Sequence, residues 1–148
     1  MIALEGPKRH YRVVRLGAVV GSLEPPGWLT DGAMTVGDQA WRLVRAGRQY
    51  AARGPSDLTA ERDRWSLRWE IAGTAAPYLI EAAGTVSRQW RVVRGRKEIG
   101  RSDIRGFWTP RAAIALPDDV PPADQVFLLW IMQDGIYRRA NGATVSNG

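Results

Sequence analysis

The chain of 148 residues contains no cysteine, and this absence excludes several classes of site at once. Disulfide bridges, thiolate nucleophiles, thiolate-bound zinc and iron–sulfur clusters all require cysteine. Histidine is nearly absent as well, because His10 is the only one. A metal site built on several histidines is therefore excluded, and a Ser-His-Asp arrangement would have to use His10, which lies between Arg9 and Tyr11 at a basic edge. We expect neither a metal nor a cofactor.

Long apolar runs are missing too. The only notable run covers Val126 to Met132, whereas a helix that spans a membrane needs about 20 apolar residues. The stretch from Met1 to Pro7 has neither the basic head nor the apolar core of a secretion signal. We therefore expect a cytoplasmic protein, and peripheral attachment to a membrane stays open.

Motifs of catalysis are equally scarce. The glycines form neither a phosphate-binding loop nor a dinucleotide fingerprint. Glu70 and Glu81 are carboxylates that neighbouring strands could pair for acid–base work, but Glu70 falls on the solvent face of its strand. We therefore predict that the protein is not an enzyme.

Lysine is also rare, so the positive charge comes from nineteen arginines and two lysines. The formal net charge is +6, and the segment between Ser87 and Arg111 carries all of it. Guanidinium groups bind phosphate and carboxylate through paired hydrogen bonds, although a GC-rich genome would also supply many arginine codons. The segment provides the candidate ligand-binding residues: Arg88, Arg91, Arg94, Arg96, Lys97, Arg101 and Arg105, with Trp108 beside them.

Short stretches with alternating faces recur from Tyr11 to Leu116 and predict antiparallel strands. In the clearest one, alternate residues are apolar and the others polar, since successive side chains of a strand point to opposite sides. We expect Trp65, Leu67, Trp69 and Ile71 in the core, and Ser66, Arg68 and Glu70 in solvent.

A recurring block combines an aromatic residue, arginines, apolar residues and a closing glycine. It covers residues 11–17, 41–47 and 90–95, and each copy predicts a strand that runs into a hairpin. In the third copy Gly95 and Arg96 would form the turn, and Lys97 would start the return strand. The stretch from Gly21 to Gly32 predicts a loop, and Pro55 to Arg64 predicts one helical turn or an exposed loop.

The end of the chain follows a different pattern. Two prolines and Asp124 precede the apolar run, and two arginines and Asn141-Gly142 follow it, which predicts a helix over about 122–139. A doubly buried strand at Val126 to Met132 is the alternative, because Gly135 costs a helix about 1 kcal/mol.

Such a helix is apolar on all sides and must be enclosed on all sides. We therefore predict a β-rich fold in which an antiparallel, closed barrel of short strands surrounds the hydrophobic C-terminal helix. Residues 1–141 would form one domain, and 142–148 a flexible tail.

The seven tryptophans divide into two groups. Five lie at expected core positions: Trp41, Trp65, Trp69, Trp90 and Trp130. Trp28 and Trp108 have no such position, and an exposed aromatic beside arginines can insert at a membrane interface or stack on bases.

This order of parts resembles the tubby-like superfamily, which includes the LURP-one-related proteins and the phospholipid scramblases. The resemblance lies in the successive short strands with glycine hairpins, the late strands of Trp90 to Gly106, a last strand over Phe107 to Leu116 and the terminal hydrophobic helix. It implies a closed antiparallel barrel around a helix, and binding of phosphoinositides or other phospholipids. A calcium site, known from scramblase-like members, is not expected, because the aspartates lack the spacing of an EF-type loop.

Three functions remain open from the sequence. The first is a binding module for anionic phospholipid or another acidic ligand, which uses the arginine-rich surface. The second is a nucleic-acid-binding protein that uses the same surface, although no RRM, KH or helix-turn-helix pattern is present. The third is a structural or protein-interaction domain without a lipid role, in which the arginines only maintain solubility.

Overall fold

The computed structural model describes residues 1–84, 89–106 and 109–145, and the side chains of these residues as far as Arg139. The described residues form twelve strands and one helix. The strands are β1 (Ile2–Glu5), β2 (Tyr11–Arg15), β3 (Ala18–Glu24), β4 (Gly32–Val36), β5 (Gln39–Ala46), β6 (Gln49–Arg53), β7 (Leu58–Arg62), β8 (Arg68–Ala72), β9 (Pro77–Ala82), β10 (Trp90–Arg94), β11 (Lys97–Arg105) and β12 (Arg111–Ile114). The helix is α1 (Pro122–Val145).

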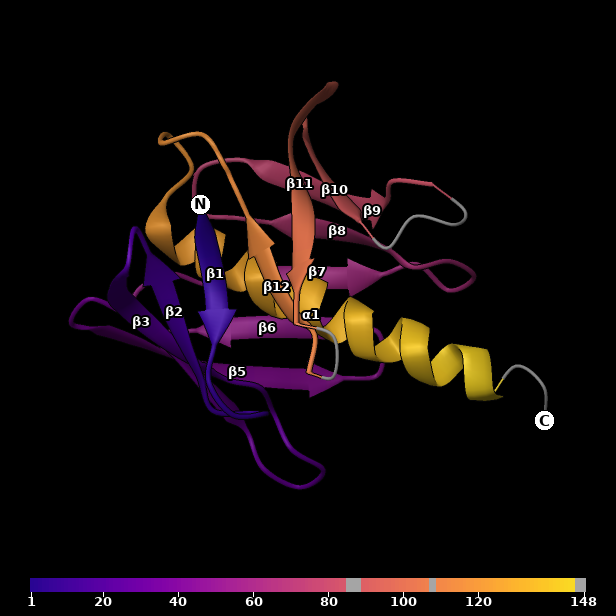
Figure 1. The fold of residues 1–148 in the computed structure, drawn as a ribbon, viewed down its shortest axis with the longest axis horizontal. Helices are drawn as coiled ribbons and strands as arrows, with labels where there is room; N and C mark the ends of the chain where they lie inside the picture. The colour runs from indigo at the N-terminus through magenta and orange to yellow at the C-terminus, as the bar shows by residue number, and fades with distance from the viewer. Residues whose placement is uncertain (85–88, 107–108, 146–148) are drawn as a thin grey trace.

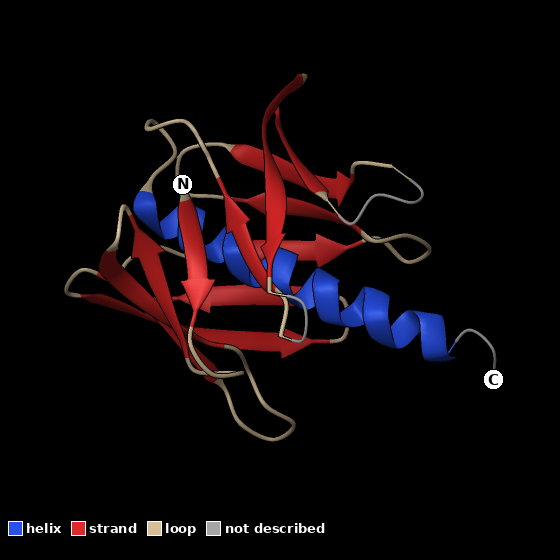
Figure 2. Ribbon diagram, in the orientation of Figure 1, coloured by secondary structure: helices blue, strands red, loops and turns tan. Residues whose placement is uncertain are grey.

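The strands form a closed antiparallel barrel, and α1 runs through its middle (Figures 1 and 2). Each strand pairs with its neighbour in the sequence, and β1 pairs with β12 to close the ring. The predicted fold class is confirmed. The apolar run from Val126 to Met132 is buried along its whole length, so the enclosure that its composition required is supplied by the barrel wall.

Aromatic side chains fill the space between helix and wall. Trp69 and Trp90 meet edge to face at 5.5 Å between ring centres, and Trp130 of α1 contacts both Tyr50 and Phe127 in the same manner. Trp41 is also buried, so four of the five tryptophans expected in the core lie there.

The fifth, Trp65, is 87% exposed, and its core prediction is wrong. The strand begins only at Arg68, because Asp63 accepts hydrogen bonds from the backbone N–H of Trp65 at 3.1 Å and the hydroxyl of Ser66 at 2.8 Å. This local turn competes with strand pairing. From Arg68 onward the alternation holds, since Trp69 and Ile71 are buried and Glu70 is exposed.

The recurring blocks form β2, β5 and β10, and each ends in a two-residue turn, as predicted. The closing glycines Gly17, Gly47 and Gly95 have φ angles of 78°, 61° and 67°, a region that glycine adopts without strain. Gly95 and Arg96 form the turn between β10 and β11, and Lys97 begins the return strand.

Three other segment predictions need correction: those for residues 55–64, for the loop from Gly21 to Gly32 and for the end of the helix. Residues 55–64 contain strand β7 rather than a helical turn or a loop: Leu58 and Ala60 face the core, while Thr59 and Glu61 give the segment its polar composition. The loop expected from Gly21 to Gly32 is limited to residues 25–31, because pairing of β3 with β4 extends along the chain on both sides.

The helix does not end near residue 139 but continues to Val145. Its last turns project from the barrel (Figure 1), where no wall obstructs them. One glycine within a helix costs only about 1 kcal/mol, so Asn141-Gly142 is a weak stop signal.

The direction of α1 distinguishes the two ends of the barrel. At the proximal end, where α1 begins, lie the turns at residues 16–17, 37–38 and 95–96. At the distal end, where α1 leaves the barrel, lie the loops at residues 6–10, 25–31, 47–48 and 63–67.

Candidate anion-binding site

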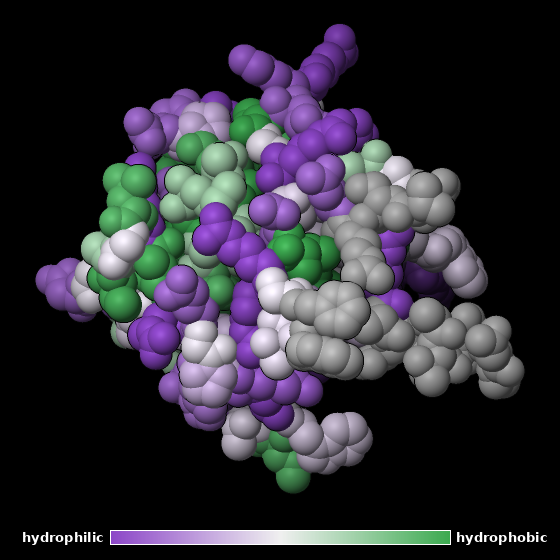
Figure 3. Space-filling view, in the orientation of Figure 1, coloured by the Kyte–Doolittle hydropathy of each residue, from purple (hydrophilic) through white to green (hydrophobic). Residues whose placement is uncertain are grey.

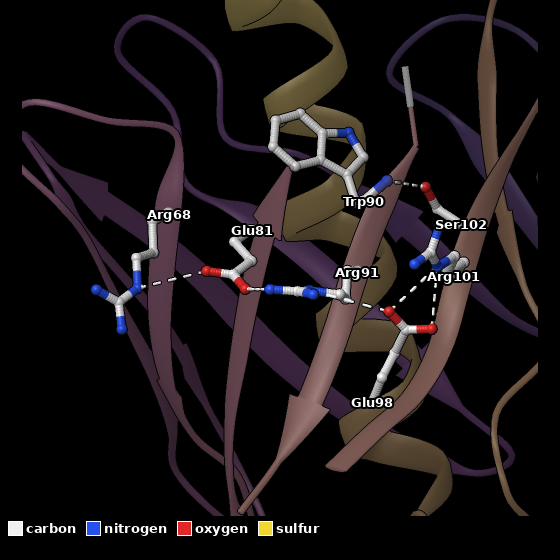
Figure 4. A network of polar contacts seen from close by, with 7 residues as sticks. All are labelled: Arg68, Glu81, Trp90, Arg91, Glu98, Arg101 and Ser102. Atoms are coloured by element: carbon white, nitrogen blue, oxygen red, sulfur yellow. Dashed lines mark hydrogen bonds and ion pairs between the residues drawn. The ribbon is translucent and has the colours of Figure 1, made fainter. Parts of the chain in front are cut away.

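The acidic side chains of neighbouring strands neutralise part of the predicted basic segment. Glu81 of β9 forms ion pairs with Arg91 of β10 and with Arg68 of β8, the latter at 3.9 Å (Figure 4). Glu98 lies between Arg91, at 3.9 Å, and Arg101, at 3.0 Å. The result is a row of alternating charges along the outer wall, in which the guanidinium groups already have carboxylate partners.

The remaining candidates are spread over the length of β10 and β11. Arg94 pairs with Asp119 at 3.2 Å at the proximal end, next to the exposed turn that carries Arg96 and Lys97. Arg105 lies toward the other end of β11, where its Nη2 donates to the sulfur of Met1 at 2.7 Å. Arg91 lies opposite Arg101, and Arg94 opposite Lys97, in the register of β10 and β11, so the described candidates follow this pair of strands along its length. Arg88 and Trp108 lie outside the described residues.

Arg111 belongs to the structure of the barrel. Its guanidinium is almost fully buried, donates to the backbone oxygens of Gly6 and Pro110, and stacks over the ring of Tyr11 at 4.9 Å. An arginine held in this way links β12 to the loop after β1. It is not accessible to a ligand.

Basic side chains do converge at the distal end, in a cavity of about 440 Å³ beside the point where α1 leaves the barrel. We call this cavity the distal pocket. Four cations and one carboxylate line it, together with two phenol rings, two prolines, a tryptophan and a glutamine. The charged and phenolic residues are Lys8, Arg9, Arg45, Arg138, Asp134, Tyr11 and Tyr137.

Asp134 holds two of these cations in place. Its carboxylate accepts from Arg45 at 2.9 Å, from Arg138 Nε at 2.7 Å and from the hydroxyl of Tyr50 at 2.5 Å. The hydrogen bonds described for Arg138 are made by Nε, and its guanidinium carries four more N–H donors on the two Nη groups. Burial alone would lower the pKa of Arg138, but the charge and hydrogen bond of Asp134 raise it above the ordinary value.

The other two cations come from the loop between β1 and β2. Arg9 has a φ of 72°, which is uncommon for a residue other than glycine. Its guanidinium lies against the loop between β3 and β4, where a Cβ at Gly27 would come within 2.5 Å of Nη2. Lys8 lies over the ring of Tyr137 at 5.0 Å. Neither has a carboxylate partner among the described residues.

Two phenol hydroxyl groups meet at the pocket wall. Those of Tyr11 and Tyr137 lie 3.1 Å apart, and burial together with this contact raises the pKa of Tyr11. Behind Asp134, burial also raises the pKa of Tyr50, and the charge of Asp134 adds to the effect. The four cations and one carboxylate give the pocket a formal charge of +3, which is the chemistry of an anion-binding site.

Sequence reasoning did not identify the distal pocket, because its four cations come from three separate segments: the loop between β1 and β2, strand β5 and helix α1. The sequence marks Arg9 only as part of a basic edge beside His10, and Arg138 only as a favourable charge near the end of the helix. Arg45 belongs to one of the recurring blocks. No local signal indicates that these residues meet; only the barrel closure and the path of α1 place them together.

A second cavity, of about 610 Å³, lies at the proximal end beside Pro122 and Val126. Its lining is mainly apolar, and its charged residue Arg15 is paired with Asp118 at 3.1 Å. It presents no cluster of cations, so it does not compete with the distal pocket as an anion site.

Comparison of the chain with family models, curated proteins and solved structures finds no match. Within the described parts of the chain, α1 is not apolar enough over a sufficient length to cross a bilayer.

Proposed function

We propose that this protein is a non-enzymatic module that binds anionic phospholipid through its basic distal end. The observation that carries the proposal is the distal pocket, where Lys8, Arg9, Arg45 and Arg138 face a single carboxylate. Two of these cations are fixed by Asp134 and two have no acidic partner among the residues described. A phosphate group would find N–H donors of several cations there, with Asp134 as the one carboxylate among the lining residues.

The fold gives further support. A closed barrel around a hydrophobic helix is the architecture that the tubby-like resemblance implies, and phospholipid binding is what the same resemblance implies for function. The distal pocket is favoured over the basic segment between Ser87 and Arg111, because carboxylates already pair with Arg91, Arg94 and Arg101 of that segment.

The test is co-sedimentation with vesicles of neutral phosphatidylcholine and of phosphatidylcholine mixed with phosphatidylserine, each at low and high salt. The double variant Lys8→Glu and Arg9→Glu removes two exposed cations at the distal end. The matched control, Arg96→Glu and Lys97→Glu, makes the same charge change at the proximal end. Thermal unfolding of both variants checks that the barrel is intact.

We expect salt-sensitive binding to the anionic vesicles only. A basic residue near such a surface contributes about 1 kcal/mol, so the distal variant should bind roughly thirtyfold more weakly or worse. The proximal control should bind like the natural sequence. Loss in the control alone would move the site to the turn between β10 and β11, and absence of binding under every condition would refute the lipid role.

Nucleic acid would use the same cations, because phosphate contacts dominate its affinity at low salt. Gel retardation with single- and double-stranded DNA and RNA, on the same two variants, separates this alternative. Retention of nucleic acid without retention on vesicles would favour it.

A further inference from the structure

The loop between β3 and β4 carries two adjacent large apolar side chains at its tip. Trp28 is 94% exposed and Leu29 is 87% exposed. Single exposed apolar residues are ordinary, but a neighbouring tryptophan and leucine at the end of one loop form a small apolar projection. The loop extends from the bottom of the view in Figure 1, and apolar atoms appear at its tip in Figure 3.

The base of this loop is part of the distal pocket. Pro25 and Pro26 line the pocket, and Arg9 lies against Gly27. The N–H of Gly27 donates to the backbone oxygen of Thr30 at 2.9 Å, which closes the tip into a tight turn. The apolar projection therefore has a fixed base with one pocket cation, Arg9, against it, and the loop's own carboxylate, Asp31, is paired with Arg42 at 3.4 Å.

A second aromatic tip occurs at the same end of the barrel. Trp65, in the loop between β7 and β8, is 87% exposed, and the guanidinium of Arg64 lies 5.7 Å from its ring centre. The turn at Asp63 that excludes Trp65 from the strand also holds it outward. Tryptophan beside basic residues is the combination found at the boundary between lipid and water.

We propose that Trp28 and Leu29 insert into the interfacial layer of an anionic bilayer, so that the distal pocket faces the lipid head groups; this inference rests on the proposed function. The insertion orients the barrel with its distal end toward the membrane and its proximal end away from it. Trp65 and Arg64 form a second contact at the same end of the barrel.

The size of the projection favours lipid over a protein partner. A stable protein interface buries about 800 Å² on each side, whereas a tryptophan contributes roughly 150–250 Å². Two side chains at the tip of one narrow loop do not supply such a face. They do supply an anchor for a surface that is itself fluid and negatively charged, and that can enclose the tip on all sides.

The absence of cysteine permits a direct test. Leu29→Cys introduces a single thiol for an environment-sensitive fluorophore such as NBD, and Asp38→Cys places the same probe on an exposed turn at the proximal end. On addition of anionic vesicles we expect a blue shift and a rise in emission at position 29, and no change at position 38. Sedimentation of the labelled proteins in the same samples measures binding separately.

The double variant Trp28→Ser and Leu29→Ser is expected to bind anionic vesicles roughly tenfold more weakly, with the remaining binding removed by high salt. Binding of the labelled protein without a response at position 29 would overturn the insertion and leave the proposed function standing. Failure of the labelled protein to sediment with anionic vesicles at low salt would overturn both the insertion and the proposed function. Unchanged binding of the double variant would also refute the insertion.

Discussion

Gly135 offers a sharp test of the packing between α1 and the barrel, because helix propensity and core packing predict opposite results there. In a solvated helix, Gly→Ala stabilises by about 1 kcal/mol. Gly135 is buried, however, and an added Cβ would lie 2.8 Å from Cζ2 of Trp90 and 3.1 Å from Cη2 of Trp69. Non-bonded carbon atoms at their optimal van der Waals separation lie about 3.5–4.0 Å apart.

Neither indole can move aside, since both rings are fully buried and pack edge to face against each other. Overpacking of this kind costs about 1–3 kcal/mol, and we take the upper part of that range because the closest contact is with a rigid ring. After subtraction of the gain in helix propensity, Gly135→Ala should lower the free energy of unfolding by about 2 kcal/mol. For a domain of this size that corresponds to a fall in Tm of roughly 4–8 °C.

The measurement is urea denaturation followed by circular dichroism, with calorimetry for the Tm. Trp90→Phe provides the matched background, because phenylalanine lacks the Cζ2 atom that the new methyl group would meet. In that background Gly135→Ala should cost at least about 1 kcal/mol less than in the natural sequence. A rise in Tm for Gly135→Ala alone would show that the packing argument is wrong.

Three further predictions concern stability. Burial raises the pKa of Tyr11, Tyr50 and Tyr78 above the ordinary value of 10.0. The contribution of these neutral phenols to the free energy of unfolding is therefore complete below pH 10 and declines as the pH rises beyond it. Urea midpoints that stay level between about pH 9 and pH 11 would contradict this. Asp124→Ala should cost about 2–3 kcal/mol in urea unfolding, because the buried carboxylate accepts from one backbone N–H and two hydroxyl groups; a loss below about 0.5 kcal/mol would speak against it. Leu16→Asn should raise the Tm, with a gain of about 0.5–1 kcal/mol, because Leu16 is exposed and has a φ of 51° beside Gly17 in a turn that favours Asn-Gly; an unchanged or lower Tm would refute the strain argument.

The architecture was predictable because its strongest signals are local. Seven consecutive apolar residues from Val126 to Met132 require enclosure, and the blocks that end in Gly17, Gly47 and Gly95 mark hairpins. The exposure of Trp65 was not predictable from alternation, since a side chain two residues earlier, Asp63, decides where the strand begins. Gly135 argued weakly for a strand, yet its small size is what the two tryptophans require.

The site was less predictable because charge was counted along the segment rather than in space. Glu81 and Asp119 lie outside the basic segment in sequence but pair with Arg91 and Arg94 across the fold. Conversely, Lys8 and Arg138 are far apart in sequence and line one cavity. Such partners are set by barrel register and by the path of the helix, which a single sequence does not encode in any short motif.

The order of elements has a consequence for how the chain is made. Every strand precedes α1 in the sequence, and the ring closes only when β1 pairs with β12. During synthesis α1 leaves the ribosome after all of the described strands, so the apolar side chains on their inner faces are exposed until it arrives. Ribosome-bound chains stopped before Val126 should therefore remain sensitive to protease over all of the strands and should bind chaperones that recognise exposed apolar side chains.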